Sequence, residues 1–197
     1  MNKATLTRLN ILQKSFELVY KNGYQATSID DIIATMKVTK GAFFYHFKSK
    51  DEMGLAMVKE VMRPGMYDTL IIPLVAAEDP LTAIYEMMEG LLSDTLFFDA
   101  RYGCPAMSMI AEMASVNESF REELGFQVKQ WQEAMSSSLE NGRKKGIVKQ
   151  EVHPGQVALF LTSGYAGIRN TGKVFGREVY DVYLKELKIY LEQLRCD

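Results

Sequence analysis

Residues 23–51 read GYQATSIDDIIATMKVTKGAFFYHFKSKD, and this stretch decides the fold. Thr27 and Ser28 are each followed three residues later by an aspartate, which is the spacing of a capping box that opens a helix. Apolar residues then recur at helical spacing. Thr39 is predicted to cap a second short helix that reaches Phe47. The stretch therefore predicts two short helices joined by a tight turn.

Longer helices are predicted on both sides of this pair. Before it, apolar residues recur at three- and four-residue steps from Thr5 to Asn22. After it, Ser49 and Glu52 form a further capping box, and the helix that they open is predicted to stop at Arg63-Pro64-Gly65, because proline breaks helices. Two short capped helices braced by a longer one form a helix-turn-helix unit, whose second short helix enters the major groove of DNA.

The rest of the chain also has helical spacing, and no segment alternates cleanly between apolar and polar residues as a strand does. We therefore expect an all-α protein of about nine helices. The later helices are predicted over about 80–98 and 105–114, from Asn117 to Gly142 or Gly146, from Pro154 onward, and over about 178–194.

Composition narrows the class of protein. Of the 197 residues, 47% are hydrophobic and 24% are charged, which excludes disordered, collagen-like and coiled-coil chains. Two cysteines and two histidines are too few for a disulfide scaffold or a zinc finger, and we expect no metal and no cofactor. No apolar run approaches the roughly 18 residues that span a bilayer, and the polar opening MNKATLTRLN is not a signal peptide. We expect a cytoplasmic protein that does not enter the membrane.

Charge is unevenly distributed along the chain. Residues 1–50 hold eight Lys or Arg against three acidic residues, whereas the whole chain has a net charge of −2. A basic first segment on an acidic remainder indicates a polyanionic partner for the first segment. A chance fluctuation among solvated side chains is the alternative.

Several residues in and beside the second short helix suit contact with DNA. Lys40 and Lys50 supply positive charge to the phosphate backbone, and Gly41 permits close approach. Tyr45 and His46 project from a helix too short to be only core, although both could be ordinary surface residues.

The stretch from Gly23 to Asp51 resembles the DNA-binding domain of TetR-type transcriptional regulators. The resemblance implies an all-helical homodimer, with a three-helix DNA-binding domain over residues 1–48 and a ligand-binding and dimerisation domain over 49–197. It also implies that the following residues lie at or near DNA: Thr27, Ser28, Thr39, Lys40, Gly41, Phe44, Tyr45, His46 and Lys50.

Three positions depart from that family's pattern. Lys37 stands where the family usually has glycine, and a positive φ there would cost about 1–2 kcal/mol. Phe44 replaces a tyrosine, and Ala42 stands where a hydroxyl or amide often reads a base. These departures predict fewer polar contacts with bases and leave the fold unchanged.

Methionine is concentrated in the middle of the chain. Residues 53–113 hold nine of the twelve methionines, which suits either an adaptable pocket or an ordinary core. The family resemblance implies an effector cavity in this region, with Tyr85 and Phe97 as possible neighbours. The predicted effector-binding residues are Met62, Met66, Tyr67, Met88, Cys104, Met107, Phe126 and Trp131.

Cys104 is a candidate sensing residue. It precedes Pro105 at an expected helix start and follows Arg101, and both features favour the reactive thiolate. A small buried hydrophobe is the alternative interpretation. The chain is also similar to a subgroup of regulators that respond to reactive electrophiles or small unsaturated acids. The residues that carry this similarity are Gly103, Cys104, Glu112, Phe120, Arg121 and Leu124. That resemblance implies that Cys104 contacts or reacts with the effector.

The last two helices carry an apolar set with small residues between its members. Gly164, Ala166 and Gly167 permit close helix packing, which suits either a core within the chain or a four-helix interface between two copies. One short recognition helix covers few base pairs, whereas two copies read a palindromic site. We therefore expect a homodimer formed through the last two helices.

These observations predict a ligand-responsive transcriptional regulator and not an enzyme. We expect a repressor that a small-molecule effector releases from a palindromic DNA operator. The alternatives are a helical thiol-dependent enzyme that acts on electrophiles through Cys104, and a partner-binding module without DNA binding. The enzyme would need a base near Cys104, and neither His46 nor His153 is placed by the sequence to serve.

Overall fold

The computed structural model describes residues 2–36, 38–94 and 99–196, and it confirms the all-α fold class. Within these ranges there is no strand, and the one β-bridge joins Val148 to Arg195. Lys37 and Phe97 lie outside the described residues, so the expectations for both stay untested. The chain divides into two compact units, Met1–Gly65 with Pro105–Gly125, and Met66–Cys104 with Phe126–Asp197.

The first unit contains the three predicted N-terminal helices, and each cap found in the structure explains where its helix begins. Ser28 and Asp31 form a full capping box at α2, the Thr39 hydroxyl accepts the Ala42 N–H at α3, and Ser49 caps α4. The predicted starts of these helices are therefore confirmed. Their bounds are α1 Lys3–Asn22, α2 Ile29–Ala34, α3 Lys40–His46 and α4 Lys50–Met57.

The predicted stop at Arg63-Pro64-Gly65 is wrong, because every residue from Lys50 to Val75 is helical. Two π-helical segments lie within this run. In each, the residue before a proline donates its N–H five residues back, Arg63 to the Val58 carbonyl and Ile72 to the Tyr67 carbonyl. A proline ring clashes with the carbonyl four residues earlier in an α-helix, and the wider π turn relieves that clash. The elements of the run are α4, η1 Val58–Met62, α5 Arg63–Met66, η2 Tyr67–Ile71 and α6 Ile72–Val75.

The remaining helices start where the sequence predicts. Asp79 caps α7, and Asn117 accepts the Phe120 N–H at the start of α9. However, α7 ends at Ser93 and not near Phe98, because Asp94 has an extended backbone that closes the helix. The bounds are α7 Pro80–Ser93, α8 Pro105–Met113, α9 Glu118–Lys144, α10 Pro154–Phe175 and α11 Glu178–Gln193. If the run 50–75 is taken as one helix, the described residues form nine.

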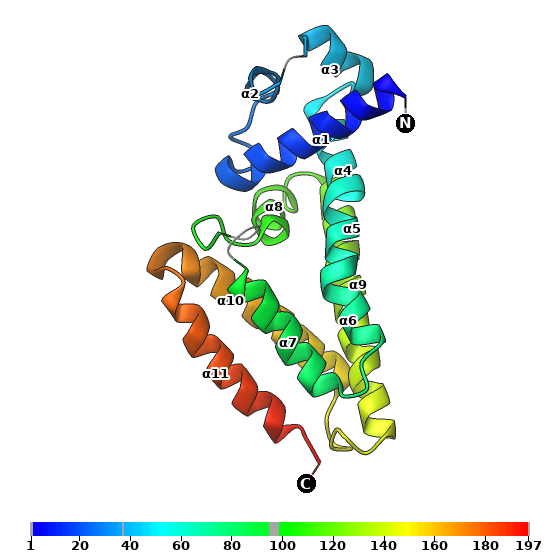
Figure 1. The fold of residues 1–197 in the computed structure, drawn as a ribbon, viewed down its shortest axis with the longest axis vertical. Coiled ribbons are helices and arrows are strands. Elements are labelled where there is room, and N and C mark those ends of the chain that lie inside the picture. Colours follow the sequence, from blue (N-terminus) through cyan, green and yellow to red (C-terminus); the bar gives the residue numbers. More distant parts are fainter. Residues whose placement is uncertain (1, 37, 95–98, 197) are drawn as a thin grey trace. The chain divides into compact units, whose positions relative to one another are not determined.

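In the second unit, α11 packs against both α7 and α10 (Figure 1). The first unit adds α4, α8 and the start of α9 to the three N-terminal helices. The two compact units therefore do not coincide with the two predicted functional domains, 1–48 and 49–197. The boundary between those domains stays a prediction.

Most of the methionines in the 53–113 cluster are core residues. Seven of the nine are buried, whereas Met66 and Met107 are half-buried.

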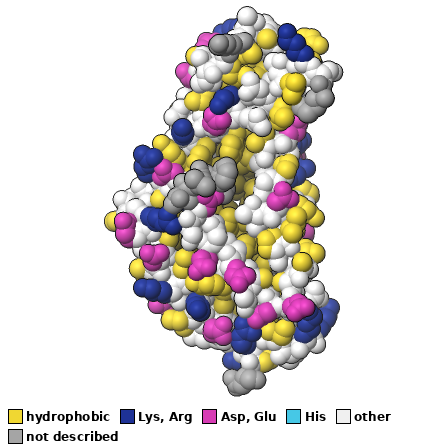
Figure 2. All heavy atoms as spheres, viewed as in Figure 1, with side chains coloured by type: hydrophobic (Ala, Val, Ile, Leu, Met, Phe, Trp, Pro, Cys, Tyr) yellow, Lys and Arg dark blue, Asp and Glu magenta, His cyan; other side chains and the backbone are white. Residues whose placement is uncertain are grey.

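Charged side chains of both signs are spread over the face shown in Figure 2, with hydrophobic ones between them. Among the described residues, none of the helices is both long enough and apolar enough to cross a membrane.

Candidate nucleic-acid interface and effector residues

Helix α3 is held by one face and exposed on the other. Phe43 and Phe47 are 0% and 1% exposed, as their four-residue spacing predicts, and their ring centroids lie 5.7 Å apart. On the opposite face, Tyr45 is 78% exposed and Phe44 is 45% exposed. Burial of the two phenylalanines therefore fixes which side chains α3 presents to the outside.

The exposed face of α3 combines the Tyr45 ring with accessible backbone at Gly41. Thr39 and Gly41 are exposed, and the nearest atom to a Cβ built at Gly41 would be the Thr39 hydroxyl, 3.8 Å away. His46 is half-buried, with its ring edge-on to Tyr45 at 4.9 Å. This face offers a hydroxyl, an aromatic ring and a close approach to the backbone, which suits a groove of DNA.

Lys40 has a partner that sequence reasoning missed. Its Nζ lies 2.9 Å and 3.2 Å from the two carboxylate oxygens of Asp30 on α2. The two residues are ten positions apart on different helices, so helical spacing gives no signal for this pair. Both side chains remain mostly exposed.

Three other predicted DNA-binding residues have structural partners. Thr27 is 1% exposed and its hydroxyl donates to the Gly23 carbonyl at 2.8 Å, whereas the Ser28 hydroxyl lies 2.6 Å from the Asp31 carboxylate within the capping box. Lys50 is half-buried, its Nζ donates to the Gln25 carbonyl, and burial lowers its pKa. The Thr27 side chain therefore packs within the turn. Ser28 and Lys50 remain accessible in part.

Glu112 of α8 binds the turn between α1 and α2. Its carboxylate accepts the backbone N–H groups of Tyr24, at 3.2 Å, and Gln25, at 2.8 Å. Gly23 has φ +90°, and a Cβ there would meet Glu112 at 2.9 Å. Phe120 packs on the Tyr24 ring at 5.0 Å. Glu112 and Phe120, two of the residues that carry the subgroup resemblance, therefore hold the turn that leads into α2.

The predicted effector residues come from both compact units. Met62 and Met107 belong to the first compact unit, and the other six belong to the second. Met62, Met88 and Trp131 are no more than 5% exposed, so they fill core. Tyr67 and Phe126 are about half exposed, at 50% and 47%.

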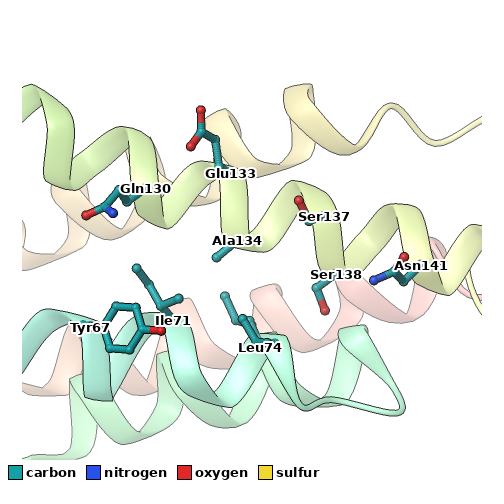
Figure 3. A pocket seen from close by; sticks show the side chains of 10 residues that line it. Tyr67, Ile71, Leu74, Gln130, Glu133, Ala134, Ser137, Ser138 and Asn141 are labelled. Carbon is teal, nitrogen blue, oxygen red and sulfur yellow. The ribbon is translucent and has the colours of Figure 1, made fainter.

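Tyr67 lines a groove of about 330 Å³ in the second unit. Apolar side chains from η2 and α6 form one wall, and mostly polar side chains from α9 form the other (Figure 3). Tyr67 is the one predicted effector residue among the ten that line this groove. The nine others, which were not predicted from the sequence, are Ile71, Leu74, Val75, Gln130, Glu133, Ala134, Ser137, Ser138 and Asn141.

Cys104 is half-buried beside buried aromatic residues. Burial and then the neighbouring Cys104 raise the pKa of Tyr165 well above its usual range. Trp131 packs edge-on against the Tyr165 ring at 5.4 Å. A polar and aromatic environment therefore surrounds the thiol.

The cation beside this site is Arg169 and not the expected Arg101. The Arg101 guanidinium binds both carboxylate oxygens of Asp99 and is exposed. Arg169 is 0% exposed and donates to the Gly103 carbonyl at 2.5 Å. The sequence pointed to Arg101 because it is near Cys104 along the chain, whereas Arg169 is far from Cys104 and only the fold brings it to Gly103.

Apolar side chains are exposed along α10 and α11. The two helices pack together, yet six of their large hydrophobic residues are 54% to 74% exposed. They are Leu159, Phe160, Val174, Phe175, Val182 and Ile189. An apolar surface of this kind on a compact unit is typical of a protein–protein interface.

Two family models match the chain. Residues 11–57 match the model described as bacterial regulatory proteins, tetR family. Residues 77–182 match the model described as tetracyclin repressor-like, C-terminal domain. Together they include the helix-turn-helix stretch and most of the remaining helices.

Curated relatives are similar over most of the chain. An uncharacterised HTH-type transcriptional regulator in the lacX 3′ region of Lactococcus lactis is 35% identical over 118 residues, 60% of this chain and 60% of that protein. The HTH-type transcriptional repressor DhaR of Mycobacterium sp. strain GP1 is 23% identical, over 83% of this chain and 80% of its own. The HTH-type transcriptional repressor NemR of Escherichia coli is 24% identical over 88% of each chain.

Solved structures share the fold. The reduced form of E. coli NemR superimposes with a TM-score of 0.81 at 22% identity, over 96% of this chain and 97% of that chain. A TetR transcriptional regulator from Chloroflexus aurantiacus gives a TM-score of 0.88 at 21% identity, over 99% and 98%. At these identities the likeness describes the arrangement of helices.

Proposed function

The chain belongs to the tetR family of bacterial regulatory proteins and is a ligand-responsive DNA-binding transcriptional regulator, and we propose that it is a cytoplasmic repressor whose α3 reads a palindromic operator. The comparisons give no support to a thiol-dependent enzyme or to a module without DNA binding. In this proposal a small-molecule effector favours a conformer with lower operator affinity, which requires that the effector bind the two states unequally.

The observation that supports DNA binding is the set of exposed side chains on α3. Phe43 and Phe47 anchor the helix, and its exposed side chains include Lys40, Phe44 and Tyr45. An anchored helix with exposed aromatic and basic groups suits the major groove, where bases are read by contacts with their edges. Thr39, Gly41 and His46 extend this face, while Ser28 and Lys50 flank it. Thr27 supports it from within the turn.

The double variant Lys40→Ala with Tyr45→Ala tests this role. We expect it to lose specific binding to the DNA upstream of its own coding sequence, measured by fluorescence anisotropy at two salt concentrations. Wild-type binding weakens as salt rises, because phosphate contacts release counterions. Lys14→Ala, an exposed lysine of α1 paired with Glu17, is the control that keeps binding. A double variant that binds like the wild type would refute the assignment.

For the effector, we propose that Cys104 is the sensing residue and that the other predicted effector residues form or support its site. The position of Cys104 beside buried Tyr165 supports this assignment, as does buried Arg169, which donates to the adjacent Gly103 carbonyl. Thiol-reactive electrophiles and small unsaturated acids are the expected effector classes.

Alkylation tests the sensor. N-ethylmaleimide should abolish operator binding by the wild type and leave binding by Cys104→Ser intact, with one modification per chain at Cys104 by mass spectrometry. Cys196→Ser is the matched control, since Cys196 is the second half-buried free cysteine. If alkylated wild type still binds the operator, Cys104 is a packing residue.

We also propose that α10 and α11 form the homodimer interface. Their six exposed hydrophobic residues support this, since two copies would cover each other's apolar surface in an isologous four-helix arrangement. At Gly167, nothing lies within 4 Å of a built Cβ, so this side of α10 has room for a partner helix.

A further inference from the structure

The positive charge that α3 offers to DNA is already paired in the structure. Lys40 is the one lysine or arginine among the residues of α3, all of which are described. Its Nζ contacts both carboxylate oxygens of Asp30, at 2.9 Å and 3.2 Å. The charge is therefore largely neutralised before DNA approaches.

Asp30 lies in the first turn of α2 but is not part of its capping box. The capping box of α2 uses Asp31, whose carboxylate accepts the Ser28 backbone N–H at 2.8 Å. Asp30 is the neighbouring residue and points to Lys40 on α3. Its carboxylate can therefore be changed without removing the cap.

The pair is exposed and therefore weak enough for a phosphate to replace it. The side chains of Lys40 and Asp30 are 61% and 73% exposed. Exposed ion pairs contribute little, because water screens the charges and the long side chains lose freedom. A DNA phosphate is an anion of the same kind as the carboxylate, so the two compete for one ammonium group.

When Lys40 exchanges Asp30 for a DNA phosphate, the Asp30 carboxylate loses its ion pair. Once Lys40 binds a phosphate, the Asp30 carboxylate is unpaired close to the DNA backbone, where like charges repel. Both the broken pair and this repulsion lower DNA affinity.

We propose that Asp30 competes with DNA phosphate for Lys40 and so limits the affinity of the protein for DNA. This inference rests on the proposed DNA-binding role of α3. It assigns an affinity-setting role to a residue of α2 that lies outside the recognition helix.

A double-mutant cycle tests the competition. Asp30→Asn and Lys40→Ala are made singly and together, and binding is measured by anisotropy with the upstream DNA and with a mixed-sequence duplex at low salt. Asp30→Asn should bind both duplexes about threefold more tightly than the wild type. In the Lys40→Ala background the same change should have little effect, because the contested ammonium is gone.

Salt dependence gives a second measurement. If Lys40 binds a phosphate, Lys40→Ala should flatten the plot of log affinity against log salt by about 0.9 in the Asp30→Asn background. Asp30→Ser is a second variant that should reproduce the gain. Glu17→Gln breaks a similar exposed pair with Lys14, 2.8 Å apart on α1, and should not change DNA affinity. Thermal unfolding checks that each variant is folded.

The outcomes separate the two proposals. An equal gain from Asp30→Asn with and without Lys40 would mean that Asp30 acts only through its general field, and no gain would mean that it does not compete; either overturns the inference. A folded wild type that binds neither duplex overturns the proposed function itself, and the inference with it.

Discussion

Glu112 illustrates, at the scale of single residues, how one carboxylate fixes a turn that lies far away in the sequence. It accepts the backbone N–H groups of Tyr24 and Gln25, and Gly23 leaves room for it. The turn leads into α2 and the Ser28 cap. The position of the helix-turn-helix unit within the first compact unit therefore depends on a residue of α8.

Replacement of Glu112 by alanine should lower the free energy of unfolding by about 1–3 kcal/mol, because two backbone donors lose their acceptor. Urea denaturation of the Glu112→Ala variant measures the change. Glu122→Ala, an exposed glutamate of α9, should stay within about 0.5 kcal/mol of the wild type. Equal effects of the two substitutions would show that the contacts of Glu112 with the turn do not matter for stability.

Asp79 is a second residue whose charge is used by the fold. Burial raises the pKa of its carboxyl, but hydrogen bonds from Arg195, Thr82 and Leu81 outweigh burial and hold the pKa below its usual range. A lowered pKa in the folded state means that the charge contributes stability above the unfolded pKa of about 3.9. That contribution is lost as pH falls through the folded value.

The Asp79→Asn variant should therefore be less stable than the wild type at neutral pH by about 0–1 kcal/mol, because asparagine still caps α7 but cannot pair with Arg195. The difference should begin to shrink below about pH 4 and disappear once pH falls below the lowered pKa of the folded carboxyl. Thermal unfolding of both proteins from neutral to acid pH measures it. A difference that stays constant with pH would contradict the expected role of the charge.

At the scale of elements, glycine sets the distance between α10 and α11. A Cβ at Gly172 would clash with the hydroxyl of Tyr180, a residue that is 2% exposed. A methyl group there cannot fit unless Tyr180 or the helix moves. By contrast, a Cβ at Gly167 on the same helix meets nothing within 4 Å.

These two glycines make a matched pair. Gly172→Ala should destabilise the fold by about 1–3 kcal/mol through overpacking, measured by urea denaturation. Gly167→Ala should raise the stability of a single chain by about 0.5–1 kcal/mol, since alanine favours a helix more than glycine does. A stable Gly172→Ala protein would show that Tyr180 can leave its site at little cost.

The π segments are the other feature at this scale. Proline in a helix interior usually ends it, yet the run from Lys50 to Val75 contains Pro64 and Pro73. Each follows a five-residue π segment, Val58–Met62 or Tyr67–Ile71, which provides room for the ring. Sequence patterns that treat proline as a stop therefore divided one helical run at Arg63-Pro64-Gly65.

At the scale of the whole molecule, the proposed homodimer would determine whether one chain or two present α3 to DNA. Leu159 and Val182 are about 60% exposed on α10 and α11. Glutamate at both positions should convert a dimer into a 22.3 kDa monomer, because charges would be buried against an apolar partner surface. Sedimentation equilibrium measures the mass.

The control for this change is Val116→Glu, an exposed apolar residue of the first unit that should leave the dimer intact. A monomeric wild type would refute the proposed homodimer. A Leu159→Glu and Val182→Glu variant that stays dimeric would place the interface elsewhere. Loss of palindrome binding by the monomeric variant is also expected, because one recognition helix covers few base pairs.

The sequence by itself determined the helix starts, the helix-turn-helix unit and the family. Caps such as Ser28, Thr39 and Ser49 act on backbone groups within a few residues, and the Phe43–Phe47 spacing alone identifies the buried face of α3. These are local properties, so they can be read from neighbouring letters.

Only the tertiary structure decided which distant groups meet. Asp30 pairs with Lys40, Glu112 with the turn before α2, and Arg169 with the Gly103 carbonyl, across ten to 88 positions in sequence. The burial of Met88 and Trp131 has the same origin, because it depends on how whole helices pack. Local spacing fixes the direction of a side chain on its helix, whereas its partner is fixed by the packing of the other helices.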